Sequence, residues 1–124
     1  MMVWLLIATV LIMAHEAGHI VCLWVSGGRV LGLVFDGWRV GVRTDVAGLS
    51  LSRRGWSALS GLMAEGMTVV IGIAVDPGRW PAWLVIWAAD LLINGVPWLP
   101  TNDGALFLRW RRASRQSAWP PRKE

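Results

Sequence analysis

The hydrophobic positions of the chain gather into three long apolar segments. They cover approximately residues 2–25, 56–75 and 80–99. At a rise of about 1.5 Å per residue, a helix of about 20 residues crosses a hydrocarbon core of about 30 Å. The main polar interruptions are a short motif in the first segment, Glu65 in the second, and Asp90 and Asn94 in the third. This pattern predicts three transmembrane helices, with a tight Asp-Pro-Gly-Arg turn at residues 76–79 between the second and third.

The polar stretch between the first two apolar segments predicts a different structure. Residues 30–35 and 38–44 favour β-strands and flank Asp36-Gly37, a dipeptide typical of hairpin turns. We expect a β-hairpin there, with residues 46–51 as a candidate third strand. After residue 99 we expect a basic helical end over residues 105–112, followed by a flexible tail. The sequence thus predicts a membrane core over residues 1–112 and a basic cytoplasmic tail over residues 113–124.

Composition and charge agree with an α-helical membrane protein. The chain of 124 residues is 55% hydrophobic and 16% charged, whereas soluble domains carry about 25% charged residues. The net charge is +4, but the basic residues lie at the ends of apolar segments, so we expect no nucleic-acid partner. They gather in the hairpin region and in the tail, which the positive-inside rule places in the cytoplasm, with the N-terminus outside. We expect a multi-pass protein of the bacterial plasma membrane, in contact with the lipid bilayer; the pattern does not indicate an oligomeric state.

Both histidines of the chain belong to one motif inside the first apolar segment. The sequence His15-Glu16-Ala17-Gly18-His19 is the H-E-x-x-H pattern, which on a helix places both imidazoles on one face, one turn apart. Two such imidazoles can bind one metal ion, and Glu16 is then placed to accept a proton from a bound water. Polar residues are disfavoured inside a membrane, so the motif indicates a metal site more strongly here than in a soluble helix.

Two carboxylates of the later segments are predicted to lie at the depth of the histidines. Counted from the cytoplasmic ends of the segments, His15 and His19 lie about 9–15 Å below the membrane surface, and Glu65 and Asp90 about 13 Å. Ionisable groups inside membranes usually face one another or a water-filled cavity. We therefore expect one polar site to which all three segments contribute.

The third segment completes a resemblance to a known family. It ends in Asn-Gly-Val-Pro-Trp-Leu-Pro-Thr-Asn-Asp-Gly, residues 94–104. An H-E-x-x-H motif in one span, followed by such an Asn, prolines and Asp-Gly in a later one, resembles the site-2 proteases, which are intramembrane zinc metalloproteases. The chain departs from the family pattern in the middle segment, which has no proline and carries Glu65 where Asn is expected, and at Asn102, where an apolar residue is common. Carried over residue by residue, the resemblance implies that His15, His19 and Asp103 are zinc ligands. It also implies that Glu16 is the catalytic base and that Asn94 positions the substrate.

The path of the chain to Asp103 leaves the third ligand open. If the third helix ran straight from Pro81, Asp103 would lie about 33 Å along its axis, at or beyond the edge of the hydrocarbon core. Pro97 and Pro100 lack an N–H and interrupt the helical hydrogen bonds, so the chain can stop advancing there and bring Asp103 back to the histidines. If the helix runs straight, Asp90 or Glu65 is the better third ligand; if it breaks, these two carboxylates are candidates for a supporting role around the ligands.

The resemblance implies zinc-assisted hydrolysis of a peptide bond in a membrane-protein substrate. In that reaction Glu16 takes a proton from the zinc-bound water and returns it to the leaving amine. The substrate helix must unwind, and its extended chain could pair with an edge of the hairpin. Two alternatives remain open: a proteolytically inactive relative that binds metal or acts as a membrane interaction protein, and a small transport or channel subunit that uses its intramembrane carboxylates.

Overall fold

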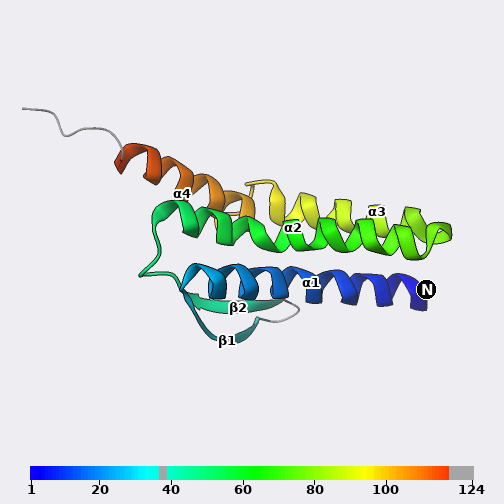
Figure 1. Ribbon diagram of the computed structural model, residues 1–124. Coiled ribbons are helices and arrows are strands. Elements are labelled where there is room, and N and C mark those ends of the chain that lie inside the picture. The colour runs from blue at the N-terminus through cyan, green and yellow to red at the C-terminus, as the bar shows by residue number, and fades with distance from the viewer. Residues whose placement is uncertain (37–38, 118–124) are drawn as a thin grey trace, which may run out of the picture.

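The computed structural model describes residues 1–36 and 39–117, which are mostly helical. The helices and strands follow one another along the chain as α1 (Met2–Ser26), β1 (Arg29–Asp36), β2 (Arg39–Asp45), α2 (Leu51–Val75), the 3₁₀ turn η1 (Pro77–Arg79), α3 (Trp80–Asp90), the π-helix η2 (Leu91–Gly95) and α4 (Asp103–Ser117). α1 and α2 lie side by side and antiparallel, and α3 runs back along α2 (Figure 1). The hairpin lies against the C-terminal half of α1, and α4 extends past the start of α2 (Figure 1).

Small residues allow α1 and α2 to pack closely. A Cβ added at Gly18 would lie 2.5 Å from the Ser60 carbonyl oxygen and 2.7 Å from the Cβ of Ala64, so only glycine fits in this part of α1. Such close approaches through glycine and alanine are common between helices in membranes. Towards the other end of the pair, Leu11 and Val69 are buried in a small apolar core. The contact at Gly18 lies within the H-E-x-x-H motif, so helix packing positions the two histidines against α2.

Two of the three predicted membrane-spanning helices are long and apolar enough to cross a bilayer. Among the described residues these are α1 and α2, with 25 residues each. Only 17% of the apolar window of α1 and 28% of that of α2 is buried, so most apolar side chains point outward rather than into a core. Length and apolar composition are therefore compatible with two membrane crossings among the described residues. The third expected span, 80–99, is shorter, because α3 passes into η2 and ends at Gly95.

The predicted hairpin is confirmed, whereas residues 46–51 do not form the third strand that the sequence suggested. β1 and β2 pair antiparallel, with Phe35 opposite Val40. Gly37 of the predicted turn and Trp38, the first residue of the second predicted strand, lie outside the described residues. Residues 46–50 form a turn rather than a strand. The Ser50 hydroxyl accepts the backbone N–H of Arg53 at 3.4 Å, which starts α2 five residues earlier than the apolar pattern suggested.

The turn at residues 76–79 is confirmed, and the end of the chain is more ordered than expected. Arg79 and Asp76 form an ion pair of 2.8 Å across η1. The predicted helix over residues 105–112 is longer at both ends, since α4 runs from Asp103 to Ser117. The proposed boundary of the flexible tail at residue 113 therefore falls inside a helix, and residues 118–124 lie outside the described part of the chain.

Candidate metal centre

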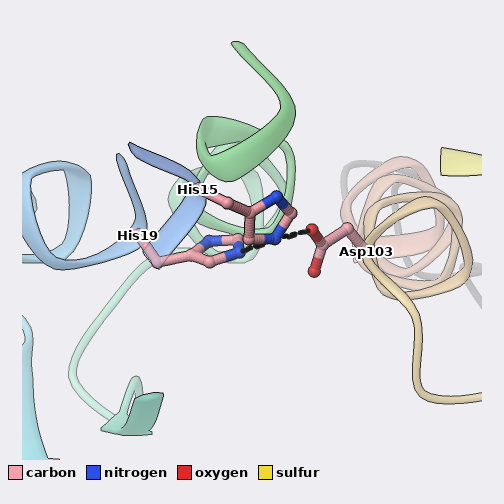
Figure 2. A group of neighbouring side chains, drawn as sticks. All are labelled: His15, His19 and Asp103. Atoms are coloured by element: carbon pink, nitrogen blue, oxygen red, sulfur yellow. Dashed lines mark hydrogen bonds and ion pairs between the residues drawn. The ribbon is translucent and has the colours of Figure 1, made fainter. Parts of the chain in front are cut away.

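The two histidines of α1 point to the same place. Their Nε2 atoms are 3.0 Å apart, and their rings meet nearly edge to face. Figure 2 shows both side chains leaving α1 towards the start of α4. His15 is buried, and His19 is half-buried. The spacing of four residues thus gives the shared helix face that the motif predicted.

Asp103 closes a triangle with the two histidines. Its Oδ2 atom lies 3.0 Å from Nε2 of His15 and 3.3 Å from Nε2 of His19 (Figure 2). In a tetrahedral zinc site with bonds of about 2.0–2.1 Å, neighbouring ligand atoms are about 3.3 Å apart. The three side chains therefore have the spacing of three ligands of one ion, and two imidazoles with one carboxylate are a donor set suited to zinc.

The other ring nitrogens are held in a way that leaves both Nε2 atoms available. Nδ1 of His19 lies 2.8 Å from the backbone carbonyl oxygen of Ser57 in α2. A carbonyl can only accept, so Nδ1 donates, and the lone pair of the neutral ring is on Nε2. Nδ1 of His15 faces two carboxylates, with Glu65 Oε1 at 3.4 Å and Asp90 Oδ2 at 3.7 Å. A carboxylate or carbonyl behind a metal-binding histidine orients the ring and raises its basicity.

Glu65 and Asp90 lie on the far side of His15 from Asp103. Both approach Nδ1 of His15, whereas Asp103 approaches Nε2 of both histidines. Glu65 is only 1% exposed, and neither of its oxygens has a hydrogen bond of good geometry. Asp90 accepts a hydrogen bond of 2.9 Å from the side-chain amide of Asn94, one turn later. Two groups of side chains could therefore hold a metal ion, His15 with His19 and Asp103, and His15 with Glu65 and Asp90; only the first contains both histidines.

The hydrogen bonds of the buried Asn102 side chain hold the start of α4 near the two histidines. After η2 its amide donates to the carbonyls of Ile93 and Val96, and its Oδ1 accepts the N–H of Ala105 at 3.0 Å. Asn102 therefore closes the proline-containing loop and caps the start of α4 in the same place. With Asn102 as the cap, the Asp103 carboxylate is free to face His15 and His19, so the family departure at Asn102 has a structural use.

Two glycines provide the space that this arrangement needs. A Cβ on Gly104 would overlap the backbone of Gly95, so the two ends of the loop touch. A Cβ on Gly61 of α2 would lie 2.6 Å from His19 Nε2 and 2.7 Å from His15 Nε2. Gly104 belongs to the Asp-Gly motif noted in the sequence, whereas Gly61 was not recognised as part of the site, because its contact with the histidines joins segments more than 40 residues apart in the chain.

The predicted site residues gather around one cavity of about 550 Å³. Glu16 is half-buried beside the histidines, on the side where the backbone of Val42 in β2 approaches its carboxylate. Apolar side chains of α1, η2 and α4 form part of the wall. The cavity is lined by all seven residues singled out from sequence, namely His15, Glu16, His19, Glu65, Asp90, Asn94 and Asp103.

Comparison of the chain with family models, with curated proteins and with solved structures gives no match. The site must therefore be interpreted from its own geometry. That geometry combines a buried set of two imidazoles and one carboxylate, which could hold a metal ion, with a second carboxylate, Glu16, at the same cavity.

Proposed function

We propose that this protein is an intramembrane zinc metalloendopeptidase, as its resemblance to the site-2 proteases implies. The observation that carries the proposal is the convergence of Asp103 with both histidines of the H-E-x-x-H motif. The three ligand atoms are 3.0–3.3 Å apart, although α1 and α4 are far apart in the chain. A pair of structural histidines would not need a half-buried carboxylate that faces both Nε2 atoms.

The membrane arrangement in this proposal has three crossings. α1 and α2 make two of them, and α3 with η2, residues 80–95, makes the third. The irregular loop after η2 is acceptable at membrane depth because it lines the cavity. The hairpin and α4 face the cytoplasm, as the distribution of basic residues indicates. These basic residues are Arg29, Arg39, Arg43, Arg53 and Arg54 before or at the start of α2, and Arg109, Arg111, Arg112, Arg115, Arg122 and Lys123 after the third crossing.

Glu16 is the general base of the proposed reaction. Zinc at the three ligands would supply the Lewis acidity that makes water a nucleophile near neutral pH. Glu16 accepts a proton from a water in the cavity as the water oxygen adds to the scissile carbonyl, and it returns a proton to the leaving amine. Asn94 uses one N–H on Asp90, and its second N–H is available to hold the carbonyl of the substrate. Glu65 and Asp90 keep the ring of His15 in place.

The substrate in this proposal is a membrane-spanning segment that has locally unwound. A transmembrane helix hides its carbonyl groups in its own hydrogen bonds, so it must become extended before attack. Val34 of β1 and Gly41 and Val42 of β2 line the cavity that holds Glu16. An extended substrate that lies along this two-stranded sheet would satisfy its backbone groups by β-augmentation.

The test separates metal binding from cleavage. Glu16→Gln is expected to keep the zinc content of the purified protein and to lose cleavage of membrane-spanning peptides, because an amide cannot accept the proton. His19→Ala is the matched control and is expected to lose both. Zinc is measured by elemental analysis, and cleavage by mass spectrometry of peptides in the same micelles. A Glu16→Gln protein that still cleaves would refute the role of Glu16, and a zinc-loaded wild-type protein that cleaves nothing would favour the inactive, metal-binding alternative.

A further inference from the structure

A second cavity, of about 300 Å³, lies between the first turns of α2 and the outer half of α4. It is separate from the metal centre and shares none of its lining residues. One part of its wall is apolar, and the other carries two arginines of α4 and a serine hydroxyl of α2. Its lining residues are Leu51, Ser52, Gly55, Trp56, Phe107, Arg111, Ser114 and Arg115.

Close packing of aromatic residues builds the apolar part of this cavity. A Cβ on Gly55 would be 3.5 Å from the ring of Phe107, so the absence of a larger side chain lets α4 cross near the start of α2. The rings of Trp56 and Phe107 are 6.0 Å apart, and Trp56 remains 55% exposed. In the proposed membrane arrangement this is the cytoplasmic end of α2, where the aromatic wall reaches the boundary between lipid tails and headgroups.

The polar part of the cavity gathers positive charge. Arg111 and Arg115 are four residues apart, so they lie on one face of α4. They line the cavity together with the first turn of α2, whose helix dipole adds partial positive charge. Within residues 1–36 and 39–117, no carboxylate forms an ion pair with either arginine. The positive charge of these two arginines is therefore available to an anionic ligand.

The neighbouring arginines of α2 already have structural partners. Arg54 donates to the carbonyls of Leu49 and Ala47 and stacks over the ring of Trp110 at 5.0 Å. Arg53 donates to the carbonyl of Ser26 at the end of α1. By contrast, the guanidinium carbon of Arg111 lies 5.9 Å from the centroid of the Phe107 ring, and a guanidinium can form paired hydrogen bonds to an oxyanion.

We infer that this cavity binds the phosphate of an anionic membrane phospholipid. Arg111 and Arg115 hold the phosphate oxygens, the start of α2 adds N–H donors, and an acyl chain follows Trp56 and Phe107. Free phosphate shares the headgroup chemistry, but the exposed aromatic wall fits a ligand that also has an apolar chain. The inference rests on the proposed membrane arrangement and not on zinc binding or proteolysis.

The test uses the full chain in neutral detergent micelles, titrated with fluorescently labelled phosphatidylglycerol. Arg111→Gln with Arg115→Gln is expected to weaken binding by at least about 10-fold, since each arginine near an anionic headgroup contributes appreciably. The matched control, Arg109→Gln with Arg112→Gln, removes the same charge from the same helix outside the cavity and is expected to change binding by less than about 3-fold. Wild-type protein is expected to prefer phosphatidylglycerol to phosphatidylcholine.

Three results would overturn the inference. Equal losses in the two double variants would mean that only the overall charge matters, and equal binding of both lipids would mean that the headgroup is not recognised. Competition by inorganic phosphate or glycerol 3-phosphate at concentrations as low as those of the lipid would instead identify a site for free phosphate. Zinc content is measured in every variant, so that failure of lipid binding is not confused with failure of the metal centre.

Discussion

Replacement of Gly61 by alanine gives the sharpest test of the metal centre, because it adds one methyl group against both ligand nitrogens. The added Cβ would lie 2.6 Å from His19 Nε2 and 2.7 Å from His15 Nε2. An ordinary contact between such atoms needs about 3.4 Å or more, so the rings or the helices must move apart by about 0.7 Å. Metal sites tolerate deviations of only about 0.2 Å in ligand distance.

The displacement in Gly61→Ala is thus several times what a zinc site tolerates. We expect zinc affinity to fall by at least about 100-fold, the upper end of what loss of a supporting contact costs. The fold itself should lose only about 1–3 kcal/mol from overpacking, partly offset by the better helix propensity of alanine. Affinity is measured by competition with a chelator of known zinc affinity, and helix content by circular dichroism.

The control for this variant is Gly66→Ala in the same helix. A Cβ there would be 3.6 Å from the nearest atom, in the ring of Trp87, which is an ordinary contact. We expect this variant to keep wild-type zinc affinity. If Gly61→Ala binds zinc as tightly as Gly66→Ala, then the two Nε2 atoms do not meet beside Gly61, and the proposed ligand geometry is wrong.

Other predictions address the third ligand, the loop and the membrane arrangement. Asp103→Ala should weaken zinc binding by at least about 100-fold and Asp90→Ala by about 10-fold or less, since only the first removes a metal bond; the opposite order in folded protein would make Asp90 the ligand. Asn102→Ala should lower the free energy of unfolding by about 1–3 kcal/mol, because buried carbonyls are left without a hydrogen bond and the helix cap is lost. It should also bind zinc about 10-fold more weakly. An unchanged melting temperature and an unchanged zinc affinity would contradict the role of the loop. A cysteine at Gly48 should react with impermeant reagents from the cytoplasmic side only and one at Gly78 from the outside only; the reverse pattern would invert the proposed orientation.

The part of the site that is local in sequence could be predicted, and the part that depends on packing could not. The spacing of His15 and His19 determines that they share a helix face, whatever surrounds them. The common depth of Glu65 and Asp90 followed from counting residues along helices, and both do reach His15. The position of Asp103 was left open because it depends on where the third helix stops.

The stop itself depends on contacts that no local pattern contains. Prolines indicated a break, but the π-helical end at Gly95 and the hydrogen bonds of Asn102 to Ile93 and Val96 require the loop to be already closed. The start of α2 was missed for a different reason. Residues 46–51 were assigned a candidate third strand, whereas residues 46–50 form a turn and the Ser50 hydroxyl, which accepts the N–H of Arg53, caps a helix that begins at Leu51. The identity of the substrate is not contained in any of these contacts.

The ligand set joins distant parts of the chain, and this has a consequence for the order of assembly. In the proposed site α1 supplies two ligands, and the third is the first residue of α4, the last helix of the described chain. A ribosome that has made only the first two helices has made a histidine pair with no third ligand. In the proposed enzyme, full metal affinity and hydrolytic capacity therefore require the start of α4 to be synthesised and to dock beside α1. If the proposed function holds, the unfinished chain is in this way kept from hydrolysing peptides before its synthesis is complete.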